Sequence, residues 1–197
     1  MQHSPKAIAG YALLAIALGA QYISGQGPII SGPPERKEQS QEAFQYVNQL
    51  RQSYGRSPLV WDERAYLLAV SRSKDMVERD YFDHVTPEGT CAKDMKAHYG
   101  FQSSEFLPEN IGGMTHYQNG SPVQGTHVKE AVDGWMGSRG HRFNLMYATH
   151  TSGAVGCYQS ICAFYGINAD RFGDGPCTTG EQGLEFWRLA PQQSGEI

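Results

Sequence analysis

The stretch "VNQLRQSYGRSPLVWDERAYLLAVSRSKDM", residues 47–76, holds two helical patterns separated by a short break. The first pattern begins before the quoted stretch, where apolar residues recur at three- and four-residue steps: Ala43, Phe44, Val47, Leu50 and Tyr54. This spacing predicts a helix that starts at about residue 38. Gly55 and Pro58 end this helix, and Asp62 is a candidate N-cap for the next. The second helix has an apolar stripe of its own, formed by Ala65, Leu68, Ala69 and Met76.

Further elements on the C-terminal side mix helices with strands. A short helix is predicted from Cys91 to Tyr99, with Gly100 ending it, and an extended segment with a turn at residues 108–113, "PENIGG". A clear helical stripe follows and stops at Gly137 and Gly140; it consists of Val128, Ala131, Val132, Trp135 and Met136. Residues 152–158 and 161–168 predict an antiparallel hairpin. Because the elements do not alternate as βαβ units, the pattern predicts the α+β class.

The two ends of the chain differ from this central part. Lys6 precedes a charge-free apolar run, residues 7–20, and no charge follows until Glu35, so residues 1–24 predict a signal peptide or an N-terminal membrane anchor. Residues 25–37 are rich in Gly and Pro and predict a linker. The domain itself is expected over residues 38–175, with a polar C-terminal tail at 176–197 that has no predicted place in the fold. Cleaved or anchored, the folded part is expected to be extracellular or at the cell surface.

The charge balance argues against nucleic acid as a partner. The chain has 16 Lys plus Arg against 20 Asp plus Glu, and no basic block or stripe. A membrane contact is expected only through the N-terminal segment, if that segment stays uncleaved.

Four cysteines agree with an exported chain, because an even number outside the cytoplasm is typical of disulfides. Three pairings are possible. Cys157 and Cys162 flank four residues between the two predicted strands, so a cross-strand bridge is sterically reasonable, and Cys91 would then pair with Cys177.

Three side chains at the ends of predicted elements are candidates for chemistry. His84 follows the second helix, Glu109 opens "PENIGG", and His141 follows the helix of Trp135. Two imidazoles and a carboxylate suit Zn²⁺ or another divalent metal, and the same trio could do acid–base work. Taken singly, each residue is better explained by a structural or solvent-facing role. The remaining histidines have no comparable context and are expected to be surface or capping residues: His3, His98, His116, His127 and His150.

Five pieces of the chain, in order between about Gln39 and Asn168, resemble the CAP family, which comprises cysteine-rich secretory proteins, insect antigen five and plant pathogenesis-related proteins. They are residues 47–76 with Gly-x-x-Pro-Leu-x-Trp-Asp, "YFDHVTPEG" (81–89), "PENIGG", "AVDGWMGSRGHRFNLM" (131–146), and "GAVGC" with "CAFYGIN". The bacterial, extracellular members, called SCP-like, are the most similar in the fourth piece. The resemblance implies a three-layer α-β-α sandwich.

The resemblance also implies a cleft that carries two histidines and two acidic residues. The matching positions are His84, Glu109 and His141, while Ser138 stands where the second acid is usual, so a three-ligand or water-completed site is expected. Asn110 and Arg142 are expected to support the neighbouring turns, and Ser138 to be a cap or turn residue.

Three functions follow as hypotheses. The favoured one is a non-catalytic module whose cleft binds a divalent metal, a small ligand or an extracellular protein. The second is a metal-assisted hydrolase, resembling a peptidase, that uses His84, Glu109 and His141. In the third, the cluster is purely structural.

Overall fold

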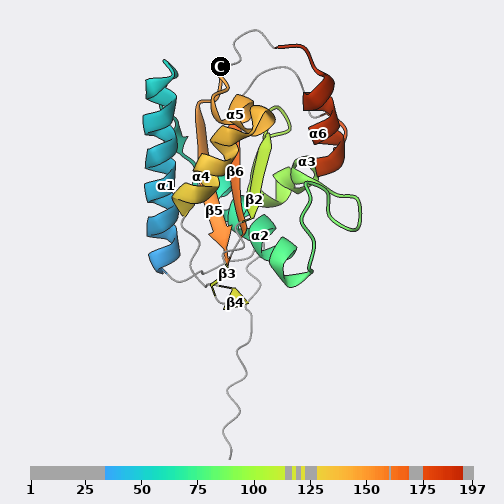
Figure 1. Cartoon of the computed structure of the whole chain (residues 1–197). Coiled ribbons are helices and arrows are strands. Elements are labelled where there is room, and N and C mark those ends of the chain that lie inside the picture. The colour runs from blue at the N-terminus through green and yellow to red at the C-terminus, as the bar shows by residue number, and fades with distance from the viewer. Residues whose placement is uncertain are drawn as a thin grey trace, which may run out of the picture.

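The computed structural model describes residues 34–113, 117–118, 121–122, 128–159, 161–168 and 175–192 (Figure 1). The predicted signal or anchor segment and most of the predicted linker lie outside these residues. Helix α1 (Pro34–Ser53) begins four residues before the expected start. A proline at the first helical position suits this early start, because its φ is preset for a helix and its missing N–H would have no partner there.

The centre of the fold is a four-stranded mixed sheet in the order β1-β5-β6-β2. Strand β1 (Val60–Trp61) runs parallel to β5 (Ser152–Tyr158), which forms the predicted hairpin with β6 (Ile161–Ile167). Strand β2 (Glu109–Gly113) closes the other edge antiparallel to β6. Two short strands, β3 (Tyr117–Gln118) and β4 (Ser121–Pro122), pair separately. The predicted α+β class is confirmed.

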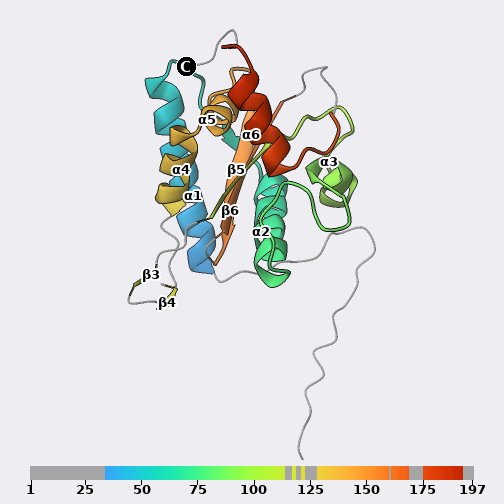
Figure 2. The same ribbon diagram turned by 45° about the vertical axis from the view of Figure 1, so that its right-hand side comes forward.

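Helices cover both faces of this sheet, as the two views show (Figures 1 and 2). Helices α1 and α4 (Val128–Gly137) pack on one face, where Val155 and Phe164 join their core cluster. Helix α2 (Glu63–Glu78) packs on the other, where the neighbouring Ala154 and Ala163 point. Successive residues of a strand face opposite sides, so the central hairpin supplies both cores. The predicted three-layer α-β-α sandwich is confirmed.

Helix α2 begins as the sequence indicates. The Asp62 carboxylate accepts from the backbone N–H groups of Arg64 and Ala65, which satisfies donors that the first helical turn leaves open. The predicted helix of residues 91–99 is confirmed as α3 (Ala92–Met95) continued by a 3₁₀ turn, η1 (Lys96–Tyr99), and Gly100 ends it with φ +77°. Such a left-handed C-cap favours glycine.

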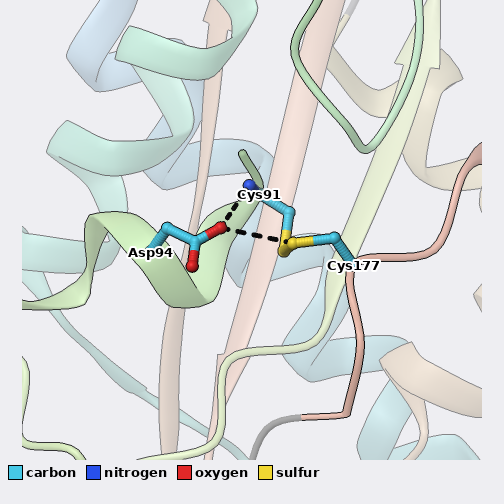
Figure 3. A group of neighbouring side chains, drawn as sticks. All are labelled: Cys91, Asp94 and Cys177. Atoms are coloured by element: carbon cyan, nitrogen blue, oxygen red, sulfur yellow. Dashed lines mark hydrogen bonds between the residues drawn. A yellow bond between two sulfur atoms is a disulfide. The ribbon is translucent and has the colours of Figure 1, made fainter. Parts of the chain in front are cut away.

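Both predicted disulfides are present. Cys157 and Cys162 are directly paired across the β5–β6 hairpin. Cys91 is bonded to Cys177, 86 residues further along the chain. Figure 3 shows Asp94 beside this second bridge, where its carboxylate accepts from the backbone N–H of Cys91 at 2.9 Å.

Two helices were not predicted. The helix of Trp135 was expected to stop at Gly137 and Gly140, but Gly140 lies inside a further helix: α4 ends at Gly137 and α5 (Arg139–Leu145) begins directly after Ser138, a single extended residue between the two. In the C-terminal tail, which had no predicted place in the fold, residues Gly180–Leu189 form helix α6. Thr179 and Gln182 make a capping box at its start, which satisfies backbone donors reciprocally. None of the helices in the described ranges is long and apolar enough to cross a membrane.

Candidate functional site

His84 lies in the loop after α2 and is hydrogen-bonded to Glu109, the first residue of β2. Its Nδ1 lies 2.8 Å from Oε2 of Glu109. An ionised carboxylate only accepts hydrogen bonds, so Nδ1 carries the proton and donates, and Nε2 is the ring nitrogen left for a ligand. The loop turns back at Gly89, where φ is +87°.

Glu109 is held by three donors at once. Besides His84, its carboxylate accepts from Arg72 Nε at 3.3 Å and from the Tyr165 hydroxyl, and only 6% of its side chain is exposed. Burial on its own would raise the pKa of Glu109, but the hydrogen bond from His84 and the charge of Arg72 outweigh burial, so the pKa lies below its usual value. The carboxylate is therefore ionised, and both of its oxygens are engaged.

Arg72 connects this carboxylate to the loop of His84. The side chain is 1% exposed and projects from α2, where Nη1 donates to the Tyr81 hydroxyl at 2.6 Å and Nη2 to the carbonyl of Asp83 at 2.9 Å. These bonds fix the segment that immediately precedes His84. Arg72 is thus a positioning residue for the histidine.

His141 lies on α5. The amide of Asn110, on β2, donates to the His141 carbonyl at 3.0 Å, so the strand holds this turn of the helix against the sheet. Burial, with a smaller contribution from the proximity of His84, lowers the pKa of His141 to about 4. The imidazole is therefore neutral near pH 7.

A chain of buried hydrogen bonds continues from Asn110 to the far end of the sheet. Asn144 Nδ2 donates to Asn110 Oδ1 at 2.9 Å, which leaves Asn144 Oδ1 to accept from His150 Nε2, also at 2.9 Å. His150 Nδ1 then accepts from the amide of Asn168 at 3.2 Å. Each member donates toward the next, and the last donation reaches the carbonyl of His141.

The expectation that His150 is a surface or capping residue is wrong, because its ring is 2% exposed. Gly166 makes room for the ring: a Cβ there would lie 2.3 Å from His150 Nε2. Burial and, to a smaller extent, the charge of Arg51 together lower the pKa of His150 to about 3, so the ring is neutral, as its donor and acceptor roles require.

Ser138 and Arg142 lie beside His141 and have different roles. Ser138 occupies the N-cap position of α5, but its side chain makes no capping hydrogen bond. Arg142 Nη1 donates to the carbonyl of Met136 at 2.8 Å and so ties α5 to the last turn of α4. Ser138 lines the same cavity as His141.

That cavity has a volume of about 950 Å³, and it brings His84, Glu109 and His141 to one wall. The rest of the wall is largely aromatic and apolar, and includes Phe82, Phe106, Phe143, Tyr147, Leu184 and Trp187. Figure 2 shows helix α6, which contributes the last two of these, crossing in front of the sheet beside α5. Cavities of this size suit drug-sized ligands.

The three candidate metal ligands share the cavity but not a single ligation point. Their donor atoms do not all lie within 4.8 Å of one another; within the described ranges only Cys91, Asp94 and Cys177 meet that spacing (Figure 3). The two sulfurs of that group form a disulfide, so they offer no thiolate to a metal.

Sequence reasoning missed Arg72, Tyr165 and helix α6. Arg72 could have been found, because it lies four residues after Leu68 and three after Ala69 on the buried stripe of α2, and a charge on such a stripe needs a buried partner. The Thr-Gly-Glu-Gln sequence at 179–182 carries the capping-box signal of α6. Tyr165 has no such signal, since an aromatic residue in a buried strand is ordinary.

Comparisons with known proteins agree with this geometry. The model of the cysteine-rich secretory protein family, CAP, matches residues 44–165. The Bacillus subtilis protein YkwD is 31% identical over 130 residues, which are 66% of this chain and 46% of YkwD. The Bacillus subtilis membrane protein YlbC is 33% identical over 112 residues, 56% of this chain and 29% of YlbC. This chain thus spans less than half the length of either relative.

Among solved structures, an extracellular protein with an SCP domain from Bacillus anthracis superimposes with a TM-score of 0.56 at 29% identity, over 70% of this chain and 45% of the other. An outer surface protein of Borrelia burgdorferi superimposes with a TM-score of 0.51 at 16% identity, over 67% of this chain and 93% of the other. The second likeness shows the fold alone.

Proposed function

The chain belongs to the cysteine-rich secretory protein family, CAP, and on that premise we propose that it is an exported binding module whose cleft retains a small ligand without catalysing a reaction. An extracellular protein and a membrane protein to which the chain is similar in sequence support a place outside the cell or at its surface. The apolar run after Lys6 supports the same location.

One observation carries the proposal: two histidines with different surroundings face one cavity of about 950 Å³. His84 is oriented by Glu109, so its Nε2 is presented as an acceptor. His141 is neutral, since burial lowers its pKa to about 4. Nε2 of His84 and the neutral ring of His141 are then the two groups that can meet a polar ligand or bind a divalent metal.

For Zn²⁺ or a similar ion, the proposal is a two-histidine site. His84 and His141 would hold the metal, while Glu109, whose oxygens already accept from Arg72, Tyr165 and His84, would orient His84 from behind. A bound Zn²⁺ would supply a Lewis acid with open coordination positions. Two protein ligands give modest affinity rather than a tight structural site.

The state of Glu109 favours binding over hydrolysis. A general base works best when its pKa lies near the working pH and its lone pairs can reach the substrate. The pKa of Glu109 is lowered from its usual value and its oxygens are engaged by three donors, so it is a weak base. Its role is to position His84 and to hold the network together.

Calorimetric titration of zinc at pH 7.5 tests the metal-binding form of this proposal. His84→Ala and His141→Ala should each weaken zinc binding at least ~10-fold, by analogy with the loss of supporting groups at metal sites. Ser138→Glu should strengthen it by adding a carboxylate at the cavity wall. The control is His98→Ala, because His98 is exposed on η1 and lies outside the cavity. Wild-type protein that takes up no zinc, or equal losses in the control, would contradict the proposal.

A further inference from the structure

Helix α6 forms part of the cavity although it lies beyond the region that matches the family model, residues 44–165. Gly180, Gly183, Leu184 and Trp187 of this helix all line the cavity together with α5 and the loop of His84. Figure 2 shows α6 passing in front of the sheet between α5 and α3. The cleft of the sandwich therefore has a roof that the family-matched region does not supply.

The anchors of α6 lie next to the two histidines. At its N-terminus, the backbone N–H of Gly180 donates to Asp83 Oδ1 at 3.2 Å, and Asp83 directly precedes His84. Just before the helix, Cys177 is bonded to Cys91. These contacts attach the first turn of the roof to the His84 side of the cavity.

At its C-terminus, the guanidinium of Arg139 caps the helix. Its Nη1 donates to the carbonyls of Trp187 and Ala190 at 2.8 and 2.7 Å, and Arg139 lies two residues before His141. The roof thus spans the cavity from one histidine's segment to the other's.

Between these anchors, α6 makes little apolar contact with the sandwich. The Trp187 ring packs on Phe143 with centroids 5.1 Å apart and lies against Gly140, where a Cβ would be 2.5 Å from the ring. None of the helix's residues is fully buried, and Leu184 is 69% exposed although it lines the cavity. Elements with few buried apolar contacts open at a lower free energy than the core.

The lining also indicates what kind of molecule the cavity takes. Its wall is rich in aromatic rings, and of the Asp, Glu and Arg side chains that the structure describes there only Glu181, which is exposed, has no contact of this kind. The other four are already engaged: Asp83 with Gly180, Glu109 with Arg72 and His84, Arg139 with the end of α6, and Arg188 with Glu185. An ionic ligand would have to compete with these contacts. An uncharged apolar body would not, and the two histidines remain for one polar group.

We propose that α6 is an opening roof and that it selects, for the cleft, an uncharged small molecule with a planar apolar body, whose polar group meets His84 and His141. In this arrangement Leu184 and Trp187 contact the apolar body from above, while Phe143 and Tyr147 contact it from α5 and the turn that follows. The inference rests on the proposed binding role of the cleft and adds the class of ligand and the element that selects it.

The test uses the full chain and an uncharged planar probe, N-phenyl-1-naphthylamine, whose fluorescence rises in apolar surroundings. Leu184→Asp places a charge on the cavity face of α6. Leu189→Asp is the matched control, because Leu189 is 65% exposed on the same helix but does not line this cavity. Leu184→Asp should weaken probe binding at least ~10-fold, the loss expected when one apolar contact is removed, and Leu189→Asp should leave it unchanged.

Hydrogen exchange gives a second readout. Saturation with the probe should slow exchange of the α6 amides, because a bound molecule holds the roof closed. Equal probe affinity in both leucine variants, or α6 exchange that the probe does not change, would overturn the inference.

Zinc titration separates this result from the proposed function. Leu184→Asp should bind zinc as the wild type does. His84→Ala should bind zinc more weakly but should still bind the probe through its apolar contacts. If zinc binding to the wild type fails while the probe still distinguishes Leu184→Asp from Leu189→Asp, the metal form of the proposed function fails and the roof inference stands.

Discussion

The sandwich and its roof are held by different forces. The sheet and its covering helices enclose two apolar clusters, and the polar groups among them, such as Arg72 and Asn144, are buried with their partners. Helix α6 has no buried residue and is attached by a disulfide and by hydrogen bonds at its two ends. A change in the sandwich therefore acts on stability, while a change in the roof acts on what the cavity holds.

The largest effect is expected from Arg72→Met, which removes one partner of a buried ion pair. Arg72 is 1% exposed and the Glu109 side chain 6%, so the substitution leaves a buried carboxylate without its cation. Breaking such a pair costs about 3–5 kcal/mol. The free energy of unfolding, measured by urea titration, should fall by that amount.

Arg79→Met is the matched control for Arg72→Met. Arg79 lies just after the same helix and forms ion pairs with Asp75 and Glu88, but it is exposed, and such surface pairs contribute little to stability. Similar losses in the two variants would show that the buried network does not stabilise the sandwich in the way its geometry indicates.

A smaller loss is expected when the roof is released. The double variant Cys91→Ser/Cys177→Ser removes a cross-link between residues 86 apart in the chain, which typically lowers the free energy of unfolding by about 2–4 kcal/mol. Because the bridge also holds the first turn of α6, the amides of this helix should exchange faster, and by a larger factor than those of α2. Unchanged exchange in α6 would mean that Asp83 and Arg139 suffice to hold the roof.

The smallest effect concerns pH and acts on the sandwich alone. The folded-state pKa of His150 is lowered to about 3, against about 6.5 in an unfolded chain, so the unfolded state binds a proton first as the pH falls. The stability from this neutral histidine is complete above about pH 6.5 and is lost progressively as the pH falls toward 3. The slope is at most about 1.4 kcal/mol per pH unit.

Urea unfolding between pH 6.5 and 5, with EDTA present, measures this slope. His150→Gln should show a shallower dependence than the wild type, since it has no ring to protonate. His98→Gln, at an exposed position, should keep the wild-type slope. His141, whose pKa is also lowered, adds the same pH dependence of unfolding to all three proteins, so it does not affect the comparison among them. Parallel slopes for wild type and His150→Gln would contradict the prediction.

Much of the sandwich could be predicted because its signals are local. Ala43, Phe44 and Val47 recur at helical spacing and are buried as that spacing requires. Asp62 caps α2 by accepting from backbone N–H groups two and three residues away, and Cys157 and Cys162 pair directly across the β5–β6 hairpin. Each of these features depends on residues close together in the sequence.

The polar interior could not be predicted in the same way, because its partners are far apart in the sequence. Arg72 meets Glu109 across 37 residues, and Tyr165 meets it across 56. His150 has no sequence feature that separates it from a surface histidine; only the space beside Gly166 makes it a core residue. The start of α6 has a local signal in its capping box, but the place of this helix over the cleft depends on contacts with Arg139 and Phe143, which lie far back in the sequence.

The series of buried hydrogen bonds that runs from Asn168 to the carbonyl of His141 also limits which substitutions are tolerated beneath the cavity. Every link uses an amide nitrogen or a ring N–H as donor and an oxygen or ring nitrogen as acceptor, all oriented the same way. An aspartate at position 144 has nearly the shape of asparagine but only acceptors, so it would face the oxygen of Asn110 with no proton between them. The substitution that looks most conservative by size is therefore among the least tolerable here, whereas Leu189, which is exposed on α6 and does not line the cavity, can change in both shape and charge.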